Sequence, residues 1–117
     1  MDEAFGDCLP GEPESLAGQP NLTGIVVIRS LTKTWGLAGL QAGCVLAAPE
    51  VIAQLAAAQP PWPVSAPALT ACIATASPAA LAEADAWARR LAGERDYLLA
   101  RLADMSAVRV VPDASAS

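Results

Sequence analysis

Residues 30–43 read Ser-Leu-Thr-Lys-Thr-Trp-Gly-Leu-Ala-Gly-Leu-Gln-Ala-Gly and follow the run Ile-Val-Val-Ile at residues 25–28. Such a β-branched run is typical of a buried strand, and the glycines and hydroxyl-bearing residues after it predict a tight turn at the strand exit. Lys33 lies within this turn. An amine that is partly desolvated in such a turn is more often neutral, and the neutral form is the one that attacks a carbonyl carbon. Lys33 is therefore a candidate nucleophile.

The same turn is suited to binding a phosphate group. Ser30 and Thr32 carry hydroxyl groups, and the glycines of the stretch leave backbone N–H groups accessible to an anion. An amine beside a phosphate site suits a cofactor that has an aldehyde at one end and a phosphate at the other. The sequence thus predicts a site for such a cofactor at the end of the strand.

The stretch resembles the lysine signature of class I/II aminotransferases, Ser-x-(Ser/Thr)-Lys-x-x-Gly-Leu-(Ala/Pro)-Gly-(Leu/Ile)-Arg-x-Gly. Residues 2–5, Asp-Glu-Ala-Phe, resemble the Asp-Glu-Ala-(Tyr/Phe) strand end of the same family and lie upstream at about the family's spacing. Residues 2–5, 10–16 and 30–35 also resemble the histidinol-phosphate aminotransferase branch, and in particular the threonine-phosphate decarboxylases of cobalamin biosynthesis.

The resemblance implies an α/β fold. The chain would be part of the three-layer large domain of a fold-type-I pyridoxal-phosphate enzyme, together with the start of the small domain. Residues 1–77 would belong to the large domain, residues 78–105 would form a long linking helix, and residues 106–117 would begin a truncated small domain. Because the family's chains are much longer, we expect this sequence to be a fragment.

The resemblance also assigns roles to five residues. Lys33 would be the catalytic Schiff-base lysine for pyridoxal 5'-phosphate, and Asp2 would pair with the pyridine nitrogen of that cofactor. Ser30 and Thr32 would contact its phosphate. Gln41 stands where the family has a phosphate-binding arginine, and its neutral amide predicts weaker cofactor binding, by on the order of 1.5–3 kcal/mol.

Each of these residues also has an ordinary structural interpretation. Lys33 alone would be a solvated lysine in a loop, Asp2 an acidic residue at a frayed end, and the hydroxyl groups common turn residues. Phe5 stands where many family members have a tyrosine that hydrogen-bonds the cofactor's 3'-oxygen. A phenylalanine cannot make that bond, so here we expect it only to pack.

The composition excludes several other classes of function. The 117 residues carry a net charge of −5, so the chain lacks the basic surface that nucleic acids require. It has no histidine, and its three cysteines are scattered without a C-x-x-C motif, so neither a metal site nor a disulfide framework is expected. Reduced thiols predict a cytoplasmic protein.

Neither export nor membrane insertion is expected. The start Met-Asp-Glu is acidic where a secretory signal is basic, and no apolar segment follows it. Residues 51–82 carry no charge, but five prolines interrupt them before a bilayer-spanning helix could form.

Periodicity and helix-start residues predict the remaining elements. Pro49, Ser65 and Ser77 are suited to helix starts. The alanine-rich helix after Ser65 is apolar on all sides and is expected to be buried. The predicted elements are strands at residues 25–29, 42–47 and 108–111, and helices at residues 49–58, 65–76 and 78–105.

Two functional interpretations remain open at this point. In the first, the chain is a fragment of a pyridoxal-phosphate-dependent aminotransferase or threonine-phosphate decarboxylase-like enzyme that acts on a small amino acid or phospho-amino acid. In the second, it is a non-catalytic remnant or a structural segment of a split or decayed gene. The chain alone is expected to be inactive and either to self-associate or to need a complementing chain, because unpaired strand edges would be left exposed.

Overall fold

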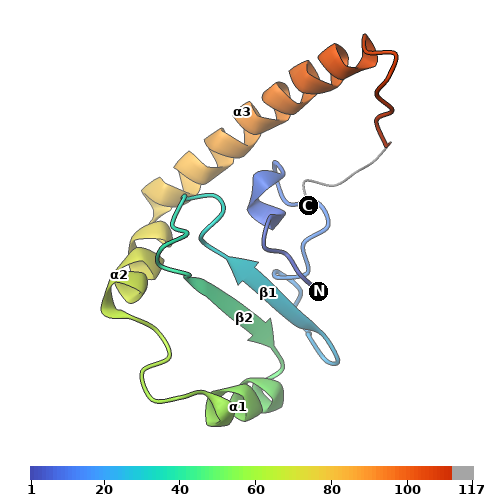
Figure 1. The fold of residues 1–117 in the computed structure, drawn as a ribbon. Coiled ribbons are helices and arrows are strands. Elements are labelled where there is room, and N and C mark those ends of the chain that lie inside the picture. Colours follow the sequence, from blue (N-terminus) through green and yellow to red (C-terminus); the bar gives the residue numbers. More distant parts are fainter. Residues whose placement is uncertain (112–117) are drawn as a thin grey trace.

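A computed structural model describes residues 1–111 of the chain (Figure 1). The molecule is elongated, with extents of 53 × 31 × 26 Å, because the last helix projects well past the remaining elements. Helices and a small sheet together make it an α/β protein. In chain order, the elements are the 3-10 helix η1 (Gly6–Cys8), strands β1 (Val26–Ser30) and β2 (Gly43–Ala47), and helices α1 (Pro49–Ala58), α2 (Ala66–Thr75) and α3 (Pro78–Ala103).

β1 and β2 pair in an antiparallel sheet that runs from Val26 opposite Ala47 to Ser30 opposite Gly43. The strands predicted at residues 25–29 and 42–47 are confirmed to within one residue at each end. Gly43 has a steric reason to be glycine, since a Cβ there would lie 2.6 Å from the carbonyl oxygen of Arg29. The two backbones can therefore approach closely at the point where the loop with Lys33 begins and ends.

The N-terminal segment lies along the other side of β1. Asp2 forms a parallel bridge with Ile28, the Glu3 N–H donates to the Ile28 carbonyl at 2.9 Å, and the Ile28 N–H donates to the Met1 carbonyl at 3.0 Å. Because the pairing is parallel, the segment and β1 end at the same edge of the sheet. Residues 2–5, interpreted above as a strand end, thus contribute a single bridge, and η1 follows directly.

The helix starts follow the capping residues. Ser65 accepts a hydrogen bond from the N–H of Ala68, and Ser77 accepts one from the N–H of Ala80, each at 3.3 Å. Each serine is followed by proline in the first turn, where a missing N–H costs nothing. The prediction for residues 49–58 is confirmed, while the long helix ends at Ala103 rather than at residue 105.

Two predictions about the second half of the chain are wrong. α2 is not buried, since Leu69 is 52% exposed and Ile73 is 77% exposed, because α3 covers only part of its apolar surface. Residues 108–111 form neither strand nor helix, because a β-branched run becomes a strand only beside a partner, and none of residues 1–111 pairs with it. Residues 112–117 of the predicted small-domain start lie outside the described residues.

Candidate functional site

Lys33 lies in the loop between β1 and β2, with its side chain exposed. A turn in which the Gly36 N–H donates to the Lys33 carbonyl holds the backbone, and Gly36 has a φ of 63°, which favours glycine. The Lys33 Nζ lies 5.1 Å from the centroid of the Phe5 ring. A cation over an aromatic face contributes about 0.5–1 kcal/mol at an exposed site. Phe5, which was expected only to pack, thus also provides an aromatic face for the Lys33 amine.

The Ser30 and Thr32 hydroxyl groups lie together at the exit of β1. Their oxygens are 2.6 Å apart, and the Ser30 Oγ also accepts a hydrogen bond from the Thr32 N–H at 3.3 Å. This local bonding orients both side chains before any ligand is present. The two residues predicted to contact a phosphate therefore lie next to each other in the structure. Both are also close to Lys33 in the sequence.

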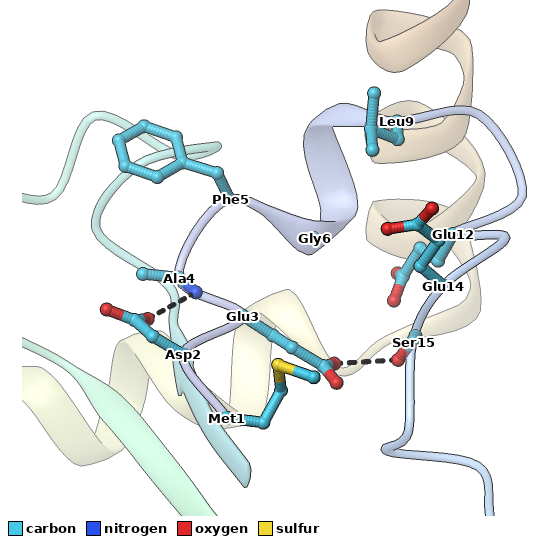
Figure 2. Close-up of a pocket in the computed structure, with 10 residues that line it drawn as sticks. All are labelled: Met1, Asp2, Glu3, Ala4, Phe5, Gly6, Leu9, Glu12, Glu14 and Ser15. Carbon is cyan, nitrogen blue, oxygen red and sulfur yellow. Dashed lines mark hydrogen bonds between the residues drawn. The ribbon is translucent and has the colours of Figure 1, made fainter. Parts of the chain in front are cut away.

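Asp2 is exposed and its carboxylate is held locally. Its Oδ1 accepts a hydrogen bond from the Ala4 N–H at 2.9 Å (Figure 2). Figure 2 shows the Asp2 and Glu3 side chains pointing to opposite sides of the segment, as successive residues of a strand do. Asp2 therefore presents a carboxylate at the sheet edge that also leads to Lys33.

Gln41 lies at the far end of the loop. Its side chain is exposed, and its φ of 49° is in the left-handed region, which costs a non-glycine residue roughly 1–2 kcal/mol. The next residue, Ala42, is buried and accepts the Leu31 N–H at 3.0 Å. The strained backbone is therefore held in place by its neighbours.

A cleft of about 630 Å³ opens between Lys33 and the face of α3. Burial raises the pKa of the Cys8 thiol in its wall, and the charge of Asp7 raises it further. The thiol therefore stays protonated near neutral pH, which makes it a poor nucleophile. The cleft is lined by Phe5, Cys8, Lys33, Trp87, Leu91, Glu94, Arg95, Tyr97 and Leu98.

The kinds of side chain at this edge suit pyridoxal 5'-phosphate, although Asp2 and Lys33 line different clefts, which share Phe5. The cofactor needs an amine for its aldehyde, a carboxylate for its ring nitrogen and donors for its phosphate. Lys33, Asp2 and the Ser30–Thr32 pair supply these groups on two parallel segments that end together. Ligands of open α/β sheets commonly bind outside the carboxyl ends of parallel strands.

Sequence reasoning did not find a group of charged residues behind this edge, which we call the Arg29 cluster: Glu3, Glu12 and Arg29. The Arg29 guanidinium makes a bidentate contact with Glu12, with Nη2 donating to Oε1 at 3.0 Å, and its Nη1 lies 3.3 Å from Glu3 Oε2. The hydrogen bond to Glu12 raises the pKa of Arg29 above its usual range. In the sequence, the only sign of this cluster was an arginine in a predicted strand with a Glu-Pro turn upstream of it.

Glu3 is nearly buried, at 8% exposure, and its charge is well compensated. Its oxygens accept hydrogen bonds from the Leu16 N–H at 2.8 Å and from the Ser15 hydroxyl at 2.7 Å, the latter drawn in Figure 2. The Leu16 N–H, followed by Ser15 and Arg29, lowers the pKa of Glu3 in spite of its desolvation. These contacts border a second, acidic cleft of about 350 Å³.

Two kinds of feature are missing from residues 1–111. No helix within residues 1–111 has the length and hydropathy needed to cross a bilayer. The same residues include no group of three or more histidine, cysteine, aspartate or glutamate side chains placed to hold a metal ion.

Comparison with known proteins gives consistent matches along the chain. The family model for aminotransferase class I and II matches residues 1–116. A histidinol-phosphate aminotransferase of Mycobacterium tuberculosis is 46% identical over 107 residues, which are 92% of this chain and 29% of the relative. One of Vibrio cholerae serotype O1 is 37% identical over 112 residues, or 94% of this chain and 32% of the relative.

A threonine-phosphate decarboxylase of Sinorhizobium sp is 49% identical over 72 residues, which are 60% of this chain and 21% of that protein. The chain thus spans less than a third of the length of the curated relatives described here.

Proposed function

The chain belongs to the aminotransferase class I and II family, whose members generally use pyridoxal phosphate, and on this basis we propose that it is the lysine-bearing fragment of such an enzyme. The observation that carries the proposal is the parallel pairing of Asp2 with Ile28, together with Lys33 Nζ over Phe5. These contacts join the two sequence motifs of the family at one edge of the sheet.

The proposed roles follow from the chemistry of each side chain. Bound pyridoxal phosphate supplies an electron-withdrawing ring for chemistry at the substrate's Cα. The Lys33 amine would hold its aldehyde carbon, and the Asp2 carboxylate would keep the ring nitrogen protonated. The Ser30 and Thr32 hydroxyls would donate to the phosphate, and the Gln41 amide would add a neutral contact.

The reaction and substrate are drawn from the relatives' names. Amino-group transfer or decarboxylation of a small amino acid or phospho-amino acid would fit them. We also propose that residues 1–77 belong to a three-layer large domain and that α3 links it to a second domain. The cytoplasmic location stays a prediction from the reduced thiols.

Completion of the enzyme would need further polypeptide. The relatives are more than three times as long as the matched part, and within residues 1–111 only β1 pairs with β2. The open edge of β2 and exposed apolar residues such as Ile73 would be covered by a complementing chain or by self-association. The alternative, a non-catalytic remnant of a split or decayed gene, would leave these surfaces uncovered.

Reductive trapping tests the proposal directly, because Lys33 is the only lysine in the sequence. Borohydride reduction of the chain with pyridoxal phosphate should attach the cofactor at Lys33, as located by peptide mass spectrometry. The Lys33→Arg variant keeps the charge and should lose the label. The Met1 α-amine is the internal control, and label there at the same rate as at Lys33 would show nonspecific chemistry and refute the proposal.

The Gln41→Arg variant tests the placement of the phosphate. An arginine would offer two parallel charged hydrogen bonds, which a glutamine amide does not. We expect about ten- to a hundredfold tighter binding of pyridoxal phosphate and little change for pyridoxal, which lacks the phosphate. Equal tightening of both ligands would mean that Gln41 does not face the phosphate.

A further inference from the structure

The Arg29 cluster adjoins both parts of the candidate site, namely the N-terminal segment with Asp2 and the exit of β1 with Ser30. Glu3 immediately follows Asp2, and Arg29 immediately precedes Ser30. The guanidinium also packs against the first residue of η1, since a Cβ on Gly6 would lie 3.1 Å from Arg29 Nη1. A movement of this guanidinium would therefore reach both the segment with Asp2 and the strand that leads to Lys33.

Few contacts hold the N-terminal segment to β1. Its main chain is joined to β1 by two hydrogen bonds with Ile28 and by one from the Met1 amine to the Val26 carbonyl at 2.7 Å, and so short a pairing frays readily. Side-chain contacts therefore add substantially to how firmly the segment is held. Glu3 is anchored to Arg29 of β1, to the Ser15 hydroxyl and to the Leu16 N–H. Glu12 fixes the plane of the guanidinium through its bidentate contact.

The Phe5–Lys33 contact depends on this arrangement. Phe5 follows Glu3 by two residues, and Lys33 follows Arg29 by four. Each is therefore only a few residues along the chain from the Arg29 cluster. A slip of the N-terminal segment along β1 would move the Phe5 ring away from Nζ. The lysine side chain has four rotatable bonds and would then sample many directions.

We propose that Arg29 is a positioning residue for the candidate site: through Glu3 and Glu12, it keeps the Phe5 ring under the Lys33 amine and so sets the direction of that amine. The role of the amine rests on the function proposed above, whereas the geometric part can be tested without any cofactor.

The test uses the scarcity of amines in this chain. Reductive methylation with ¹³C-formaldehyde labels two groups only, Lys33 and the Met1 α-amine, because the sequence has a single lysine. The Phe5 ring current shifts the Lys33 methyl signal of the intact chain, and Phe5→Leu gives the signal without the ring. We expect Arg29→Met to move the Lys33 signal at least halfway to the Phe5→Leu value, and Arg29→Lys to move it less.

Arg89→Met is the matched control, because Arg89 pairs with Asp85 on the exposed side of α3. It should leave the Lys33 signal in place. An unchanged Lys33 signal in Arg29→Met would overturn the inference. If that variant loses its helical circular dichroism, Glu12→Gln decides instead, since it retains the Arg29–Glu3 contact: a partial shift supports the inference and no shift refutes it.

A second arm separates this inference from the proposed function. Where the unmodified chain is trapped by pyridoxal phosphate at Lys33, Arg29→Met should be trapped at least tenfold more slowly, and an equal rate would contradict control of the amine's direction. A chain that is not trapped at Lys33 refutes the proposed function, and the methyl signals then still decide whether Arg29 positions the amine.

Discussion

Residues 1–47 and the helical residues 49–103 are held together in different ways. In the first region, hydrogen bonds and ion pairs join residues 17 and 26 positions apart, and Val27 is fully buried. In the second region, most hydrogen bonds are within helices, and Ile73 is 77% exposed. The candidate site therefore depends on contacts between distant segments of the chain. The helices depend mainly on local contacts, and part of their apolar surface is exposed.

Gly43→Ala should break this comparison most strongly. Its Cβ would meet the Arg29 carbonyl oxygen at 2.6 Å, so β1 and β2 would have to separate. We expect the free energy of unfolding to fall by about 3 kcal/mol or more, as measured by urea denaturation. Gly39→Ala is the control, because a Cβ there meets no atom within 4 Å. Equal effects in the two variants would contradict the close approach of the strands.

Truncation of one aliphatic residue in each region compares their packing directly. Val27→Ala removes a fully buried side chain and should lower the free energy of unfolding by about 2–3 kcal/mol. Ile73→Ala removes an exposed one and should change it by less than about 0.5 kcal/mol while reducing self-association. Urea denaturation measures the change in stability, and analytical ultracentrifugation measures the change in self-association. A large loss of stability at Ile73 would mean that α2 is already covered in solution.

Acidification should weaken the first region through Glu3. Its pKa is lowered in the folded chain, chiefly by the Leu16 N–H, so the stability it contributes is present above its unfolded pKa and is lost as the pH falls through the folded one. Glu3→Gln should cost about 2 kcal/mol at pH 7. The gap between the two chains should narrow as the pH falls below the ordinary glutamate pKa and should close only below the lowered pKa of the folded chain.

Urea denaturation of both chains from pH 7 to pH 3 measures this gap. Glu83→Gln is the control, because Glu83 lies exposed on α3. It should change the free energy of unfolding by less than about 0.5 kcal/mol throughout. A gap between the parent chain and Glu3→Gln that stays constant with pH would show that the Glu3 charge is not what stabilises the N-terminal segment.

Gly93→Ala should sharpen the comparison with the smallest effect. Gly93 is exposed within α3 and a Cβ there meets no atom within 4 Å, so alanine should stabilise the helix by about 0.5–1 kcal/mol. Amide hydrogen exchange should slow in α3 and remain unchanged in β1. Equal slowing in both would mean that the two regions unfold as one unit.

The sequence predicted best those features that neighbouring residues determine. Ser77 with the following proline marked the start of α3, and the β-branched run at residues 25–28 marked β1. The strand predicted at residues 108–111 failed because pairing is not a local property. The expected burial of α2 failed for a similar reason, since composition shows that a helix is apolar but not what covers it.

The candidate site divides along the same line. Lys33, Ser30 and Thr32 could be proposed as site residues because they lie within one short motif. The Phe5–Lys33 contact and the Arg29 cluster could not, because both require the N-terminal segment to be placed beside β1. Arg29 in particular appears in the sequence as an ordinary cation at a strand end.

The 26-residue separation between Glu3 and Arg29 also bears on how the chain folds. A helix forms within about a microsecond from contacts three and four residues apart, whereas closing a long loop carries an entropic cost before any contact rewards it. Closing this loop brings Glu3 and Phe5 to β1 and shortens the remaining closure to Glu12. The residues around the amine are therefore expected to take up their arrangement in one cooperative step that limits the rate of folding, after the helices have become available.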